Sequence, residues 1–306
     1  MNFTAMELSV IQTNDSGFFG ETSIVDFECE YGKTIYRFRI EKRLKREIRI
    51  GTDRMVECEE LFKMEELIEQ LLFLFDGRFF PIENVTLIDE NENPGIYEKE
   101  VNENFYNKRL PIYNSSDICR EPYMKLVDYK DINMQTVIGK WAKLFDELDI
   151  VFSMFLYCLS DIRMPVDCKI TSVIEMAKPI TELVEKYNSS YSVKRNKNNR
   201  LSLKLALESL INNFGDEIFG KEQADFDSFL NMLVNTRNTI SHINFFKGKD
   251  CLNGTQCVFY IAKLSILYRK IIFILFGFAE DVYDKNIQKA INAWDNWYYK
   301  EQNAVE

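Results

Sequence analysis

The sequence contains one histidine in 306 residues, and its seven cysteines include no C-x2-C pair. Zinc sites are built from several cysteines and histidines at short spacings, so the sequence offers no transition-metal site. An odd number of cysteines without paired spacing also argues against a disulfide framework and favours reduced thiols in a cytoplasmic protein. We therefore expect no bound metal and no other cofactor.

Long apolar runs and an excess of positive charge are also missing. The most apolar stretch, residues 257–279, is interrupted by Lys263, Arg269 and Lys270 and so predicts a buried helix, not a membrane span. The first residues, MNFTAMELSVIQ, lack the basic and apolar regions of a signal peptide. The net charge is −10, because 48 acidic residues outnumber 38 basic ones. Such a protein does not coat nucleic acid non-specifically, so any contact with RNA must be local.

The chain is apolar enough for two domains with packed cores, since 46% of its residues are hydrophobic and 14% are aromatic. Residues 23–30 and 33–40 alternate apolar with polar side chains, which predicts antiparallel strands around a turn at Gly32. From residue 134 apolar side chains recur at three- and four-residue steps, which predicts helices. We therefore expect an α+β protein: a β-rich N-terminal domain at residues 1–125, for sensing or partner binding, then an all-α bundle at residues 126–306.

Within these domains the pattern predicts individual elements. A helix is expected at residues 64–75, ended by Gly77, and residues 89–103 are expected to be a turn or mobile loop. Pro179 should kink the helix that contains it. Further strands are expected at residues 79–88 and 109–113, and helices at 134–161, 171–187, 201–214, 226–246, 254–277 and 281–299.

The lone histidine lies in the run Asn235-Thr-Arg-Asn-Thr-Ile-Ser-His242, which reads R-N-x3-H. On a helix Asn238 and His242 share one face, and the long side chain of Arg237 can reach back toward them. Imidazole transfers protons near neutral pH, and guanidinium binds phosphate and offsets developing negative charge. The trio suits phosphate ester chemistry, while a lone histidine near a helix end also serves plain structural roles.

The segment FLNMLVNTRNTISH, residues 229–242, resembles the signature helix of HEPN domains, whose R-x4–6-H motif often has Asn after the Arg. The upstream stretch RLSLKLALE, residues 200–208, and the apolar helix after the motif are similar to the HEPN domain of ApeA-like anti-phage proteins. The resemblance implies a metal-independent endoribonuclease in which the RNA 2′-hydroxyl attacks the adjacent phosphate and leaves a 2′,3′-cyclic phosphate. His242 would be the general base or acid, Arg237 would stabilise the phosphorane, and Asn238 would orient His242 or the phosphate.

HEPN sites usually form where two motif helices meet across a two-fold axis, so the resemblance also implies a homodimer through the motif helix. That helix carries more apolar side chains than packing onto its own bundle requires. They are Leu230, Leu233, Val234, Ile240, Ile243 and Phe246. An acid on a neighbouring helix can complete such a site, and the candidates are Glu175 and Glu208, which could equally be surface or capping carboxylates.

Two basic segments could either bind RNA or simply remain solvated. Lys194, Arg195, Lys197 and Arg200 lie close together in a loop rich in Ser, Asn and Lys, which either stays solvated or contacts the RNA backbone. Residues 37–49 likewise either bind RNA phosphates or protect a solvated strand edge from aggregation.

The ApeA-like resemblance implies a role in bacterial phage defence, in which cleavage of host RNA, with tRNA as a candidate substrate, arrests growth. A phage-derived molecule or a nucleotide would be the trigger. A second function stays open, a non-catalytic HEPN module that binds a nucleotide or a partner protein and dimerises through the same helix. A plain helical scaffold is the third.

Overall fold

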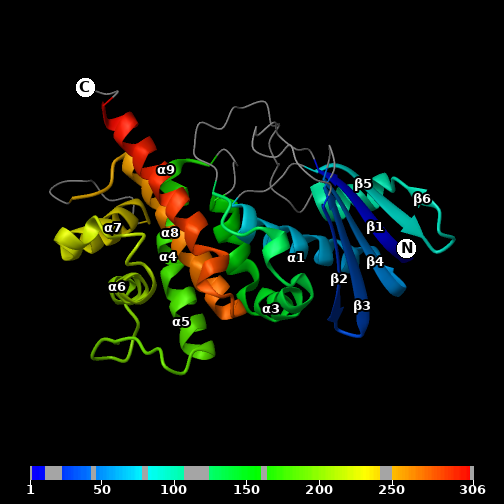
Figure 1. The fold of residues 1–306 in the computed structure, drawn as a ribbon, viewed down its shortest axis with the longest axis horizontal. Coiled ribbons are helices and arrows are strands. Elements are labelled where there is room, and N and C mark those ends of the chain that lie inside the picture. Colours follow the sequence, from blue (N-terminus) through cyan, green and yellow to red (C-terminus); the bar gives the residue numbers. More distant parts are fainter. Residues whose placement is uncertain are drawn as a thin grey trace. The chain divides into compact units, whose positions relative to one another are not determined.

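The computed structural model describes residues 2–10, 23–42, 46–77, 82–106, 124–159, 164–241 and 250–303. The chain divides into two compact units, Met1–Ile118 with Asp128–Glu147 and Cys119–Val127 with Leu148–Glu306. The first contains an antiparallel sheet and the second is helical, which confirms the predicted α+β class (Figure 1). These units are defined by contacts between residues and say nothing about function. The predicted division into two functional domains at residue 125 therefore stays a prediction.

The N-terminal unit is built on a six-stranded sheet in the order β2-β3-β4-β1-β5-β6. All of its neighbouring strands are antiparallel. The alternating stretches form β2 and β3 as predicted, joined at Gly32, whose φ of 63° is easy only for glycine. The strands are β1 (Asn2–Val10), β2 (Ser23–Tyr31), β3 (Thr34–Lys42), β4 (Arg46–Glu57), β5 (Ile82–Asp89) and β6 (Pro94–Gly95).

One face of this sheet is apolar, with Phe38, Ile50 and Leu87 among its buried side chains. Helix α1 (Cys58–Asp76) contacts β1 and β4 and buries most of its length. It begins six residues before the predicted start, where the Glu57 N–H donates to Glu60 Oε1 at 3.4 Å. It ends at Gly77, as predicted, with the glycine in the left-handed conformation.

The predicted loop at residues 89–103 was only partly correct. Asp89 Oδ1 accepts from the backbone N–H groups of Asn91 and Asn93 at 2.8 and 3.0 Å and so builds a turn. The chain then forms α2 (Glu98–Val101), whose Val101 is buried. Burial of this side chain explains why a helical turn replaces a loop here. The strand predicted at 109–113 lies outside the described residues.

Helix α3 (Met134–Leu159) begins in the N-terminal unit and continues into the helical unit. Its Trp141 is fully buried and donates from Nε1 to the carbonyl of Leu67 in α1 at 2.8 Å. The helical unit then contains α4 (Val166–Glu175), α5 (Ala177–Tyr187), α6 (Leu203–Phe214), α7 (Phe226–Ser241), α8 (Gly254–Phe276) and α9 (Asp284–Asn303).

Helix α8 is the buried helix predicted for the apolar stretch, and it contacts α4 and α9 (Figure 1). Two of its three cations are buried with partners: Lys263 Nζ lies 2.6 and 2.9 Å from the two carboxylate oxygens of Glu222, and Arg269 donates to the carbonyl of Met124 at 2.9 Å. None of the helices among the described residues combines the length and apolar character needed to span a membrane.

The expected kink at Pro179 is a one-residue break between α4 and α5 at Met176, whose backbone keeps right-handed helical angles (φ −59°, ψ −18°). Proline has no N–H to bond the carbonyl four residues earlier, which here belongs to Glu175, and its ring crowds that carbonyl. The first helix therefore ends at Glu175, and a second one starts at Ala177. The break places Glu175 at the end of α4.

Candidate functional site

Arg237 and Asn238 lie in the last turns of α7, both partly exposed. The inward face of the helix holds Leu230, Leu233 and Thr236, which are all buried. This spacing turns the arginine and the asparagine toward the helix surface. His242 lies outside the described residues.

The chain that follows the motif returns to the same helix. The buried hydroxyl of Thr236 accepts a hydrogen bond from the N–H of Leu252 at 2.8 Å. One turn later Thr239 Oγ1 lies 3.7 Å from Cys251 Sγ. Ser241 ends α7, and Cys251 and Leu252 contact the same helix. The residues before and after segment 242–249 therefore lie within one or two turns of Arg237.

Arg237 forms an ion pair with Glu175 at the end of α4, through its Nε and the carboxylate Oε1. Both contacting atoms are inaccessible to solvent, although the two side chains are 26% and 33% exposed. Arg237 Nη1 also donates to Asn238 Oδ1 at 2.9 Å. The guanidinium is thus fixed on two of its sides, and the described residues supply no partner to Nη2.

The charge of Glu175 also acts on a buried tyrosine of α8. Burial, and secondly the negative charge of Glu175, raise the pKa of Tyr268 in α8 above its ordinary value. The phenol therefore stays protonated at any physiological pH. Arg237 is the cation that compensates the Glu175 charge at this end of α4.

The two candidate acids are separated by the structure. Glu175 contacts the motif, whereas Glu208, half-buried on α6, makes no hydrogen bond or ion pair with any described residue. Both are glutamates on helices upstream of the motif, so the sequence alone gave no means of choosing between them.

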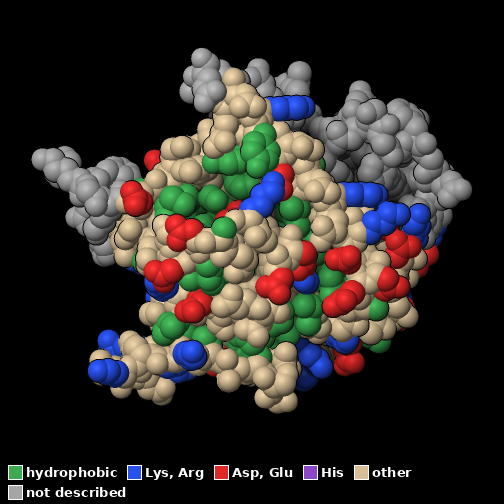
Figure 2. Space-filling view, turned by 60° about the vertical axis from the view of Figure 1, so that its left-hand side comes forward, with side chains coloured by type: hydrophobic (Ala, Val, Ile, Leu, Met, Phe, Trp, Pro, Cys, Tyr) green, Lys and Arg blue, Asp and Glu red, His purple; other side chains and the backbone are tan. Residues whose placement is uncertain are grey.

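The basic loop between α5 and α6 projects from the helical unit and gathers basic side chains (Figure 2). Lys194, Lys197 and Arg200 are exposed. Arg195 is engaged, since its Nη2 lies 2.5 Å from Glu185 Oε2. Among the described residues, none of these four side chains contacts Arg237, Asn238 or Glu175. The structure therefore does not bring the loop together with the motif, and its contact with RNA stays a prediction.

The apolar residues that motivated a dimer are only partly available on the surface. Leu230 and Leu233 are 1% and 0% exposed because they pack within their own unit. Val234 and Ile240 are half-buried. Ile243 and Phe246 lie outside the described residues. The dimer through α7 stays a prediction with a smaller apolar surface than expected.

Metal ligands are not gathered anywhere in the described ranges: no three His, Cys, Asp or Glu side chains are grouped to hold an ion there. Among the described cysteines, Cys29, Cys58, Cys168, Cys251 and Cys257 form no disulfide.

Arg237 and Asn238 thus lie near the end of α7 in a helical unit, and the motif continues in sequence to His242. Comparison with protein families gives the specific group: residues 167–282 match the family model described as Apea-like HEPN. The resemblance is thus confirmed for this segment, which includes Glu175, Glu208, the basic loop and the whole motif. No curated protein and no solved structure shows significant similarity to the chain.

Proposed function

We propose that the protein is a HEPN endoribonuclease that cuts RNA without a metal, by attack of a 2′-hydroxyl on the adjacent phosphate. The observation that carries the proposal is the fixed guanidinium of Arg237, held by Glu175 and Asn238 at the surface of the motif helix. A preorganised cation stabilises charge that develops on a phosphate without reorganising during the reaction.

In this reaction His242 removes the proton from the 2′-hydroxyl or donates one to the leaving 5′-oxygen. The nucleophilic oxygen forms a bond to phosphorus, and the bond to the 5′-oxygen breaks, leaving a 2′,3′-cyclic phosphate and a 5′-hydroxyl. Arg237 binds the non-bridging oxygens through the N–H groups that Glu175 and Asn238 do not use.

The same contacts assign narrower roles to the two neighbours of Arg237. Asn238 Oδ1 accepts from Arg237 Nη1, so it orients the arginine. Glu175 is a positioning residue, because its carboxylate forms an ion pair with Arg237 Nε. A second copy of the motif helix would complete the site in a homodimer, which adds positive charge to an acidic protein.

The biological setting that we propose is growth arrest in phage defence, by cleavage of host RNA such as tRNA. The N-terminal unit would receive a phage-derived or nucleotide trigger. The match of residues 167–282 to the Apea-like HEPN family supports this setting.

The test is cleavage of total RNA and of tRNA by the full chain. Wild type is compared with Arg237→Ala and His242→Ala, and Lys289→Ala is the control for loss of an exposed cation elsewhere in the same unit, on α9. Loss of roughly 10²–10³-fold in rate is expected for each motif variant, with circular dichroism unchanged. Equal rates in both motif variants and wild type would refute the assignment.

One observation favours the alternative, a non-catalytic HEPN module. The Arg237–Glu175 pair joins α7 to α4, which is also what a purely structural arginine does. In that case Arg237→Ala lowers stability, and the wild-type protein cuts none of the RNAs tested.

A further inference from the structure

A second site lies on the outer face of the N-terminal sheet, opposite the face covered by α1. The side chains of Arg37, Arg39 and Arg49 stand on this face and are 50–57% exposed. They line a hollow of about 820 Å³. Small-molecule pockets commonly have volumes of roughly 300–1,000 Å³, so the hollow has room for a ligand of nucleotide size.

The floor of the hollow is made by small and apolar residues. Gly51 lies directly between Arg37 on β3 and Ala5 on β1, and Ala5 is followed in the same row by Ile88 on β5. Because Gly51 has no side chain and Ala5 has one methyl group, the sheet surface is recessed beside Arg37. Ala5 and Ile88 are only 4% and 8% exposed, so the open part of this recess lies over Gly51 beside Arg37.

Glycine at position 51 is not required by the backbone. A Cβ added there would meet only Arg37, at 3.9 and 4.0 Å, which is ordinary contact. A glycine inside a strand lowers stability and often marks a place where a ligand or another backbone comes close. The absence of a side chain at Gly51 therefore keeps the hollow open but lowers the stability of the fold.

The next row of the sheet carries a like-charge pair. Arg39 on β3 is the direct cross-strand neighbour of Arg49 on β4, an arrangement that destabilises a sheet. A phosphoryl group bound between the two guanidinium groups would relieve this repulsion and use their forked geometry.

The arginines already have acidic neighbours, and these ion pairs are exposed. Arg49 Nη1 lies 3.3 Å from Glu7 Oε1, and Arg39 Nε lies 4.0 Å from Asp26 Oδ1. Exposed pairs of this kind contribute little free energy, so a ligand phosphate can replace the carboxylates at low cost.

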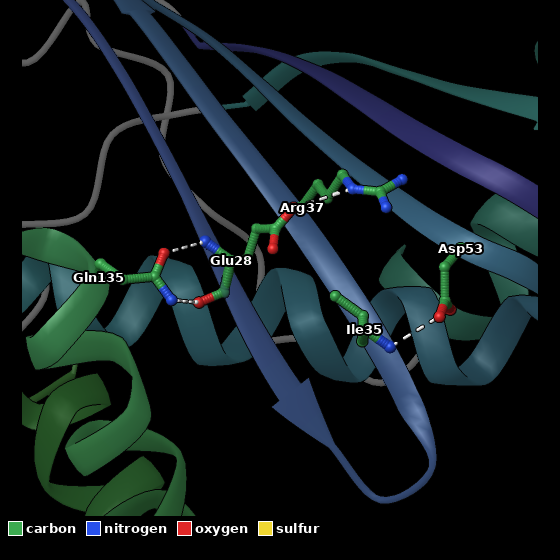
Figure 3. A network of polar contacts seen from close by, with 5 residues as sticks. All are labelled: Glu28, Ile35, Arg37, Asp53 and Gln135. Atoms are coloured by element: carbon green, nitrogen blue, oxygen red, sulfur yellow. Dashed lines mark hydrogen bonds and ion pairs between the residues drawn. The ribbon is translucent and has the colours of Figure 1, made fainter.

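Arg37, which forms one border of the hollow, is held in position by Glu28, and Glu28 is held by Gln135. Arg37 Nε lies 3.0 Å from Glu28 Oε1, and Figure 3 shows the Gln135 side chain bonded to the backbone of Glu28. The Glu28 N–H donates to Gln135 Oε1 at 2.7 Å, and Gln135 Nε2 donates to the Glu28 carbonyl at 2.8 Å. The amide pairs with edge strand β2 as another strand would and holds this border of the hollow in place.

We propose that this hollow binds a nucleotide, with its phosphate between Arg39 and Arg49 and its base over Gly51, beside Arg37. The site lies in the N-terminal unit and does not depend on RNA cleavage by the HEPN segment. The same phosphate chemistry could be presented by an RNA strand, so the test includes both sources.

The experiment is titration calorimetry of the full chain with ATP and, separately, with a 2′-O-methylated oligonucleotide, which has no free 2′-hydroxyl to be cleaved. We expect ATP to bind wild type. The variant Arg39→Gln/Arg49→Gln should bind roughly tenfold or more weakly, because charge-assisted hydrogen bonds are lost. Gly51→Val should fill the hollow and weaken binding equally, with a thermal midpoint at least equal to that of wild type. Lys33→Gln/Lys99→Gln removes the same charge from exposed positions outside the hollow and should bind as wild type does.

Binding of the oligonucleotide alone, lost in the same two variants, would assign the phosphate site to RNA and overturn the nucleotide. Absence of binding by both probes at millimolar concentration overturns the site itself. Binding that falls equally in the Lys33→Gln/Lys99→Gln control also overturns it, since general charge would then be the cause.

Discussion

Replacement of Glu175 by glutamine isolates the role of the carboxylate that holds Arg237. Glutamine keeps the shape of the side chain and an oxygen that can accept from Arg237 Nε, but it removes the negative charge. An ion pair near the protein surface contributes roughly 0–1 kcal/mol. The two side chains are 26% and 33% exposed and their contacting atoms are inaccessible to solvent, so this pair belongs near the upper end of that range. We therefore expect a loss of about 1 kcal/mol in the free energy of unfolding.

The effect on cleavage should be of similar size if Glu175 only orients the arginine. A loss of about 1.4 kcal/mol of transition-state stabilisation is roughly a tenfold fall in kcat. KM and the pH dependence of kcat should stay close to those of wild type, because no proton passes through Glu175. Arg237→Ala, which removes the cation itself, should lower kcat by roughly 10²–10³-fold.

The assay is single-turnover cleavage of RNA across pH 5–9, with urea denaturation of the same samples. Glu182→Gln is the matched control, since this glutamate is exposed on α5 in the same unit. If the cleavage rate of Glu175→Gln fell as far as that of His242→Ala, and the acid limb of its pH profile were lost, Glu175 would be a proton-transfer group. A fall in stability with unchanged cleavage would show that the ion pair only joins α4 to α7 and has no role in cleavage.

Three further outcomes are expected. Lys263→Met leaves Glu222 unpaired where the two side chains are only 2% and 8% exposed, so urea denaturation should show a loss of roughly 3–5 kcal/mol, largely restored by adding Glu222→Gln. Cleavage should continue in EDTA, because the 2′-hydroxyl is the nucleophile and needs no metal-bound water; a strict need for magnesium or manganese would contradict this. Burial raises the pKa of Cys257 to about 12, so iodoacetamide at pH 8 should label exposed Cys168 and leave Cys257 unmodified in peptide mass spectra.

The sequence predicted elements best where one local pattern decides them. The alternation of residues 23–40 gave β2 and β3, and the apolar stretch that begins near Cys257 gave the buried helix α8. The expected loop at 89–103 failed because burial of Val101 is a tertiary effect that a polar, proline-containing segment does not reveal. Pro179 predicted a kink in its helix, and only the structure showed that the first helix ends at Glu175.

For the candidate site, the sequence indicated which motif residues lie close together but not which residues of other helices contact them. Arg237 and Asn238 are adjacent in sequence, so their closeness follows from the chain itself. The partner Glu175 lies on another helix, and its contact depends on how α4 packs against α7. The same limit affected the dimer argument, because Leu230 and Leu233 are used within the unit and the sequence does not say which apolar face turns inward.

The chemistry of the cut ends tests the proposed reaction most directly. RNA cleaved by the full chain should carry a 2′,3′-cyclic phosphate on one side and a 5′-hydroxyl on the other when the fragments are analysed by mass spectrometry. His242→Ala should give no such fragments above background. Fragments with 5′-phosphate and 3′-hydroxyl ends, or the same fragments in undiminished amount from His242→Ala, would contradict attack by the RNA's own hydroxyl with His242 transferring the proton.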